Sequence, residues 1–243
     1  MKANPLRFRY LNSMLSAFLI LGAVHAVAET ALPDTPSVNR TSVSSSAQPL
    51  DDRPGTSFFS TFRSYDAAIQ LGPQTPREKL AVGISSSFGP SGILFSGAKA
   101  GLGQASNTYP AFRQGAQGYG RYYWHAFADQ AVENITVQSL LPIALKQDSR
   151  YYGLGHGGIA RRTGYALSRV LITRTDGQRQ TFNASEVIGA GAAAGISTAY
   201  YPDQYRTWTK TGQRWLSNVL VDGGFMVVRE FWPDVSRKLF RRN

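Results

Sequence analysis

Residues 119–141, YGRYYWHAFADQAVENITVQSLL, are the stretch that decides the fold. At 100° per residue, polar side chains such as Asp129 and Glu133 fall on one side of a helix, and apolar ones such as Trp124 fall on the other. This pattern predicts an amphipathic helix whose aromatic side is buried against a core. Pro142 is expected to bend or end it, because proline lacks the N–H that a helix interior needs.

Two segments without charged residues lie on either side of this helix in the sequence. Residues 80–98 are interrupted by Gly89-Pro90, which predicts two short helical pieces, and residues 187–202 form a glycine- and alanine-rich run. Glycine-rich helices have low intrinsic stability and need close neighbours. We expect tight helix packing at pairs of glycines four residues apart: Gly97, Gly101, Gly191 and Gly195.

These segments predict an all-α domain over residues 75–243, a bundle of five or six short helices packed through glycine and alanine. The turn signal Asp176-Gly177 adds a small β-hairpin near 170–182. A last helix is expected over 209–231, stopped by Trp232-Pro233, with a basic tail after it.

The beginning of the chain predicts export. Residues 1–28 combine a basic start, an uncharged apolar run over 14–24 and small residues before Ala28, as in a cleaved signal peptide. A membrane anchor is the alternative, but the run is shorter than the roughly 20 residues that a span needs. Residues 29–74, rich in Ser, Thr and Pro, predict a disordered tether that ends in a short aromatic segment.

Composition narrows the classes of partner. The chain has 243 residues and a formal net charge of +11, and it contains no cysteine, which excludes disulfides, thiolate metal sites and cysteine nucleophiles. A basic exported protein suits anionic lipid or a cell-envelope polymer better than nucleic acid. Basic residues outnumber acidic ones between 146 and 182, and we assign the contact surface to Arg150, Arg161, Arg162, Arg169, Arg174 and Arg179. The alternative is a solvated basic face.

Two histidines are the candidates for chemistry. His125 precedes Asp129 by one helical turn, so a carboxylate could orient the imidazole as a base, although a solvated polar face explains the same spacing. His156 lies in the glycine-rich stretch 153–158, whose amides could face an anion. No spacing predicts a metal site or a cofactor.

Four short motifs carry a resemblance. They read DxRYY (148–152), FNASE (182–186), YYP (200–202) and EFWPD (230–234). Through them the chain, over roughly residues 76–235, resembles a family of exported bacterial proteins with no established activity. The resemblance implies export and one domain, and it transfers no catalytic role. Because buried charges need partners, we also expect Arg150 to pair with Glu230 or Asp234.

The sequence thus predicts a protein of the periplasm or the outer membrane surface. We expect a non-catalytic structural or interaction module that contacts a membrane or an anionic envelope polymer. The alternative is a periplasmic hydrolase using His125 with Asp129, or His156. A homo-oligomer, an envelope-protein partner, and membrane insertion of 80–98 and 187–202 all stay open.

Overall fold

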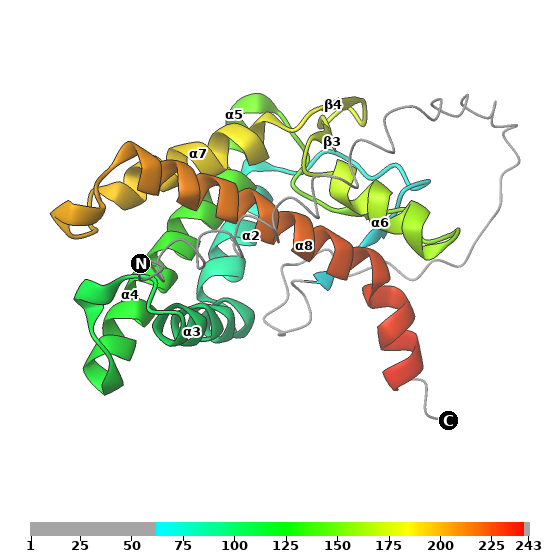
Figure 1. Cartoon of the computed structure of the whole chain (residues 1–243). Helices are drawn as coiled ribbons and strands as arrows, with labels where there is room; N and C mark the ends of the chain where they lie inside the picture. The colour runs from blue at the N-terminus through cyan, green and yellow to red at the C-terminus, as the bar shows by residue number, and fades with distance from the viewer. Residues whose placement is uncertain (1–61, 241–243) are drawn as a thin grey trace, which may run out of the picture. The chain divides into compact units, whose positions relative to one another are not determined.

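The computed structural model describes residues 62–240, so the expected signal peptide and most of the expected tether lie outside the described residues. The described chain is mostly helical, which confirms the all-α class (Figure 1). Its α-helices are α2 (Pro76–Phe88), α3 (Pro90–Ala105), α4 (Gly115–Ile135), α5 (Leu141–Leu145), α6 (Ile159–Ser168), α7 (Ala184–Thr198) and α8 (Trp208–Phe240).

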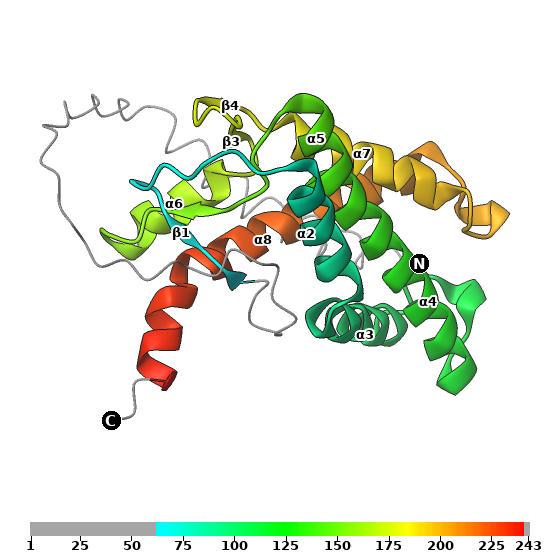
Figure 2. The same ribbon diagram turned by 180° about the vertical axis from the view of Figure 1, so that it is seen from behind.

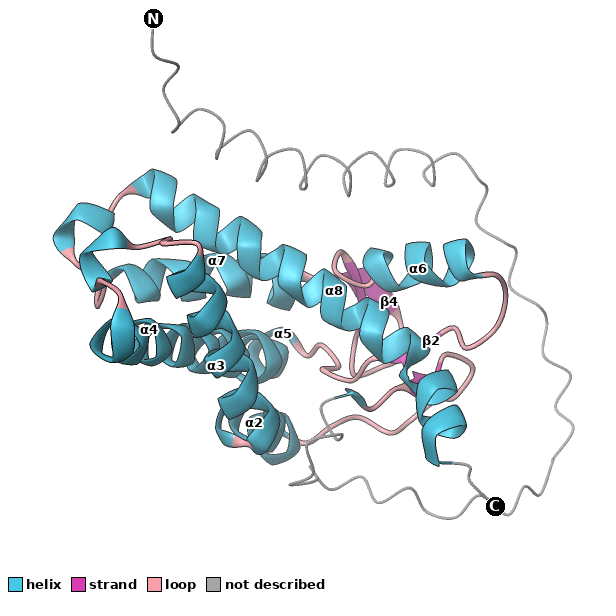
Figure 3. Cartoon of the chain, turned by 60° about the horizontal axis from the view of Figure 1, so that its bottom comes forward, coloured by secondary structure: helices cyan, strands magenta, loops and turns pink. Residues whose placement is uncertain are grey.

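Strands form only two small pairs in the described part, and they lie beside α6 (Figure 3). The expected hairpin is confirmed: β3 (Ile172–Arg174) pairs antiparallel with β4 (Gln180–Phe182). In addition, β1 (Tyr65–Asp66) pairs in parallel with β2 (Tyr152–Gly153). This pairing attaches the segment before α2 to the rest of the fold, and Phe62 packs on Trp232 with ring centroids 5.0 Å apart.

The central helix is longer than the quoted stretch. α4 begins at Gly115 and passes through a π-helical turn, Thr136–Leu140, directly into α5. Pro142 therefore does not end the helical run. It occupies the first turn of α5, and the wider π turn before it accommodates the missing N–H.

The other helices pack around this run. α2 and α3 contact α4, and α7 contacts both α4 and α8 (Figures 1 and 2). Gly83 of α2 and Gly189 of α7 set the closest approaches: an added Cβ would lie 3.0 Å from the Asn134 carbonyl oxygen and 3.0 Å from Val137 Cγ2, respectively. α2 and α7 therefore each approach the α4 and π-helical run closely at a glycine.

The four glycines expected at helix contacts divide into two pairs. Gly97 and Gly191 face aromatic side chains of α4 and α8. At Gly101 and Gly195 an added Cβ would meet no atom within 4 Å. Spacing alone did not identify the contacting glycines, because it does not specify which helical face meets a neighbour.

The expectation that α4 buries its aromatic side is wrong. Trp124 is 56% exposed, whereas Glu133 is 7% exposed and Ser139 is fully buried. The reason is that the neighbouring helices present small polar groups that bond to the polar face. Ser96 Oγ lies 2.9 Å from Gln130 Oε1, and Ser139 Oγ donates to the Lys79 carbonyl oxygen at 2.8 Å.

α8 is also longer than expected, because it continues through Gly223-Gly224 and Pro233 to Phe240. The last part of the helix turns away from the axis of the earlier part, as helices do at an internal proline (Figure 1). The helix persists because Glu230 and Asp234, on either side of the proline, both bind Arg162.

No helix of residues 62–240 combines the length and the hydropathy required to cross a bilayer.

Candidate functional site

A cavity of about 340 Å³ lies among α3, α4, α7, α8 and the loop at 147–152. Its walls carry more ionisable groups than an ordinary helical core. Each of four helices contributes at least one of them: Lys99 from α3, Glu133 from α4, Glu186 from α7, and Asp222 and Arg229 from α8.

Local structure explains how Glu186 reaches the cavity. Asn183 caps α7 by accepting from the Glu186 N–H at 3.2 Å. The reciprocal bond of a capping box is absent, because the Asn183 N–H donates instead to the Leu171 carbonyl oxygen at 2.8 Å. The Glu186 carboxyl is thus not held at the cap, and it hydrogen-bonds to Asp222.

Three acids of the cavity, Glu133, Glu186 and Asp222, have raised pKa values. Burial, followed by the charge of Asp222, raises the pKa of Glu133 to about 8, against a lowering effect of Lys99. Burial and Asp222 also raise the pKa of Glu186 well above its ordinary value. Burial raises the pKa of Asp222 as well. Burial and mutual repulsion thus disfavour the ionised form of each of these three carboxyls.

Two carboxyl oxygens in the cavity lack a hydrogen-bond partner. They are Glu133 Oε1 and Glu186 Oε1, and their residues are 7% and 4% exposed. Buried polar atoms are nearly always satisfied, so each exception calls for an explanation. Within residues 62–240, no three His, Asp or Glu side chains come together in a way that could hold a metal ion.

A second buried cluster, which we call the Glu230 lock, lies close by. Glu230 accepts from Tyr151 Oη at 3.0 Å and, at 2.9 Å each, from Arg162 Nε and the Leu154 and Gly155 N–H groups. Arg162 also pairs with Asp234 at 2.5 Å.

The expected pairing of Arg150 with Glu230 or Asp234 is wrong. Arg150 donates to Asp148, with Nη2 at 2.9 Å from Oδ2, because both residues lie in the same loop. Arg162 takes the place beside Glu230 and Asp234, since α6 packs against α8.

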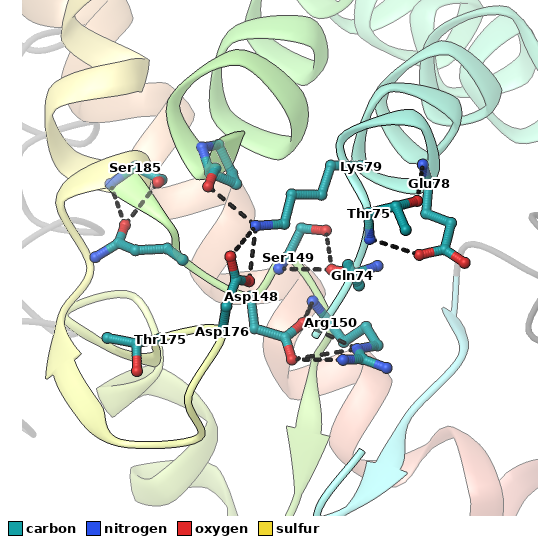
Figure 4. A network of polar contacts seen from close by, with 12 residues as sticks. Gln74, Thr75, Glu78, Lys79, Asp148, Ser149, Arg150, Thr175, Asp176 and Ser185 are labelled. Carbon is teal, nitrogen blue, oxygen red and sulfur yellow. Dashed lines mark hydrogen bonds and ion pairs between the residues drawn. The ribbon is translucent and has the colours of Figure 1, made fainter. Parts of the chain in front are cut away.

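A polar network fixes the loop that forms one wall of the cavity (Figure 4). Lys79 is 1% exposed, and its Nζ lies 2.7 Å from Asp176 Oδ1 and 3.1 Å from the Pro142 carbonyl oxygen. Gln74 Oε1 accepts from the Ser149 N–H and hydroxyl at 3.1 and 2.8 Å. The start of α2 is thereby tied to the hairpin turn and to the loop.

The six arginines assigned to a contact surface do not share one exposed face. Arg161 and Arg179 are exposed. Arg162 is buried in the Glu230 lock, and Arg150 is bound to Asp148. The remaining two, Arg169 and Arg174, are half-buried and lie over the rings of Tyr165 and Tyr152.

His125 does not pair with Asp129, as the first of the two catalytic alternatives required. His125 Nδ1 lies 2.7 Å from the Arg121 carbonyl oxygen. Asp129 accepts from Tyr200 Oη and Tyr201 Oη at 2.6 and 2.7 Å instead. His156 is exposed in its loop, and neither histidine lines the cavity.

Sequence reasoning missed the acids of the cavity, although a signal was present. Glu186 is the one charged residue of α7, and Lys99 is the one charged residue of α3. A lone charge in an otherwise uncharged helix indicates a buried, partnered or functional group. Residues of the DxRYY and FNASE motifs also line the cavity.

No family model, curated protein or solved structure matches the chain. The resemblance to a family of exported bacterial proteins therefore stays a prediction.

Proposed function

We propose that the protein is an exported, non-catalytic module of the cell envelope that binds a membrane with the apolar faces of its helices. One observation carries this proposal. Along residues 80–98 and 187–199, every exposed residue is apolar or glycine. The exposed large side chains of these segments are Leu80, Ile84, Phe88, Ile93, Leu94, Ile188 and Ile196.

The exposed faces are continuous along each helix. Leu80, Ile84 and Phe88 repeat every four residues on α2, and Ile188 and Ile196 stand eight apart on α7. Large contiguous apolar patches mark membrane or protein contacts, because leaving them in water costs about 25 cal/mol per Å². The buried positions of the same helices are mostly glycine, alanine and serine, with Lys79 on α2 and Glu186 on α7, so the larger apolar side chains face outward, the opposite of a water-facing helix.

The helix lengths favour partial insertion. α2 and α3 have 13 and 16 residues. At 1.5 Å per residue they extend about 20 and 24 Å, which is short of the roughly 30 Å hydrocarbon layer. Helices of this kind embed an apolar face at the interface. The net charge of +11, which is +8 without the three basic residues of the expected signal peptide, adds attraction to anionic lipid.

Vesicle flotation tests the proposal. The chain is mixed with vesicles of anionic or zwitterionic lipid, and the bound fraction is compared for Leu94→Glu and Gln213→Glu. Both variants add one negative charge at an exposed helical position, but only Leu94 lies in an apolar face. We expect Leu94→Glu to lose most of the binding and Gln213→Glu to keep it.

Two results would contradict membrane binding. Equal binding of the two variants would show that the apolar faces do not contact lipid. A soluble dimer that Leu94→Glu dissociates, together with no vesicle binding by the unmodified chain, would assign the same face to self-association.

A further inference from the structure

Five ionisable groups of the cavity wall act on one another. They are three carboxyls, those of Glu133, Glu186 and Asp222, and two cationic side chains, Lys99 and Arg229. With these five groups ionised, the cluster is one positive charge short. The other charged residues of the wall are Asp148, Arg150, Arg169 and Arg174; Arg150 is bound to Asp148, and Arg169 and Arg174 lie over tyrosine rings. The two carboxyl oxygens without a partner, on Glu133 and Glu186, belong to this same set.

We propose that the cavity binds a small organic cation, with its ammonium or guanidinium group between Glu133 and Glu186. One such charge completes the balance, and its N–H groups supply the missing donors. This inference goes beyond the proposed membrane contact and does not depend on it, since it uses interior residues.

The chain's own lysine leaves this position open. The Lys99 ammonium lies 5.7 Å from the centroid of the Phe95 ring. It influences the pKa of Glu133 through its charge, yet Glu133 Oε1 remains without a hydrogen-bond donor. A ligand nitrogen can therefore make a contact that no described side chain makes.

The surroundings favour an organic cation over a metal ion. No three acidic or histidine ligands of residues 62–240 are placed to hold one metal ion. The cavity walls also include Val137, Val221, Phe225 and Met226, which offer contact to a hydrocarbon chain. A volume of about 340 Å³ falls within the range of small-molecule sites, roughly 300–1,000 Å³.

Binding of a cation should release a proton. The groups that face Glu133 are Lys99 of α3, Asp129 of its own helix, Glu186 of α7, and Asn218 and Asp222 of α8; Arg229 acts on Glu186. Burial among them raises the pKa of Glu133 to about 8. The cation needs the ionised carboxyl, so its affinity should rise with pH up to about pH 8 and should fall up to tenfold per pH unit below it.

Calorimetry on the full-length chain, kept in mild detergent, provides the test. The probes are n-butylammonium and n-butylguanidinium, with n-butanol as the neutral analogue and calcium chloride as the inorganic cation. We expect saturable binding of the two organic cations, no binding of butanol, and a heat that changes with the ionisation enthalpy of the buffer because a proton is released.

Matched variants locate the site. Glu133→Gln and Glu186→Gln keep the shape of each side chain and should weaken binding at least tenfold. Asp203→Asn, an acid whose side chain is 92% exposed, should leave binding unchanged. If a glutamine variant does not fold, the proton release of the unmodified chain still tests the assignment.

The inference is overturned if no saturable binding is found, if both glutamine variants bind the organic cations as tightly as the unmodified chain does, or if calcium is the only cation bound. Loss of vesicle flotation with retained cation binding would contradict the proposed function and leave the cation site intact.

Discussion

Glu230 and Glu186 are both buried glutamates, 1% and 4% exposed, yet their surroundings differ completely. Glu230 accepts from four donors supplied by a loop, a tyrosine and an arginine. Glu186 bonds to another acid and has one oxygen without a partner. The first arrangement stabilises a fold, whereas the second leaves binding capacity unused.

The surroundings of Glu230 also explain what the backbone amides of the glycine-rich stretch 153–158 bind. Its sequence indicated amides that could face an anion. The N–H groups of Leu154 and Gly155 do face one, but it is the internal carboxylate of Glu230. The anion site of this loop is therefore occupied by the protein itself.

The largest effect is expected in the Glu230 lock. Glu230→Gln replaces one accepting oxygen by an N–H₂ group and leaves Arg162 buried without its full counter-charge. We expect a loss of about 3–5 kcal/mol in the free energy of unfolding, measured by urea denaturation. Asp203→Asn serves as the exposed control, and a loss below about 1 kcal/mol in Glu230→Gln would contradict a structural lock.

In the cavity, the corresponding substitution, Glu133→Gln, should increase the free energy of unfolding rather than decrease it. The folded-state pKa of Glu133, about 8, lies above its ordinary value of 4.5. Between these two values the folded state keeps a proton that the unfolded state has lost, so stability falls as pH rises from about 4.5 to about 8. Glu133→Gln should reduce this slope and make the chain about 2 kcal/mol more stable at pH 8.

Urea denaturation as a function of pH checks this prediction. A variant that is destabilised at pH 8, or that keeps the full slope, would show that Glu133 is ionised and satisfied in the folded state.

The sequence predicted where several helices and the hairpin lie, but it did not predict which side of each helix is buried. Uncharged runs, Gly89-Pro90 and Asp176-Gly177 predicted α2, α3, α7 and the hairpin, because these signals are local. The burial of Glu133 and the exposure of Trp124 depend on which neighbours α4 meets, and the amphipathic pattern gave the wrong face. The amphipathic pattern assumes that the apolar side of a helix is buried, and helices that bury small and polar residues do the reverse.

The close contact between α2 and the α4 and π-helical run gives the next test. In Gly83→Ala the new methyl group would press on Ser139 and on the Asn134 carbonyl oxygen, since α2 approaches α4 closely there. We expect a loss of about 1–2 kcal/mol. Gly101→Ala is the matched control, because its methyl group meets no atom within 4 Å, and it should be neutral or up to about 1 kcal/mol stabilising. Thermal unfolding of both variants would refute the assigned contact if Gly83→Ala matched the control.

The smallest expected effect on stability separates two adjacent arginines. Arg161 is exposed, whereas Arg162 is 7% exposed and binds Glu230 and Asp234. Arg161→Gln should change the free energy of unfolding by less than about 0.5 kcal/mol, while Arg162→Gln should cost several times more.

For membrane affinity the order of the two variants should be reversed, with the larger loss in Arg161→Gln. Removing the exposed charge of Arg161 should weaken binding to anionic vesicles by about 1 kcal/mol at low salt, and the difference should shrink as salt rises. If Arg161→Gln binds anionic and zwitterionic vesicles as the unmodified chain does, the charge contribution to the proposed membrane contact is wrong at this position. The apolar faces would then have to account for binding without help from Arg161.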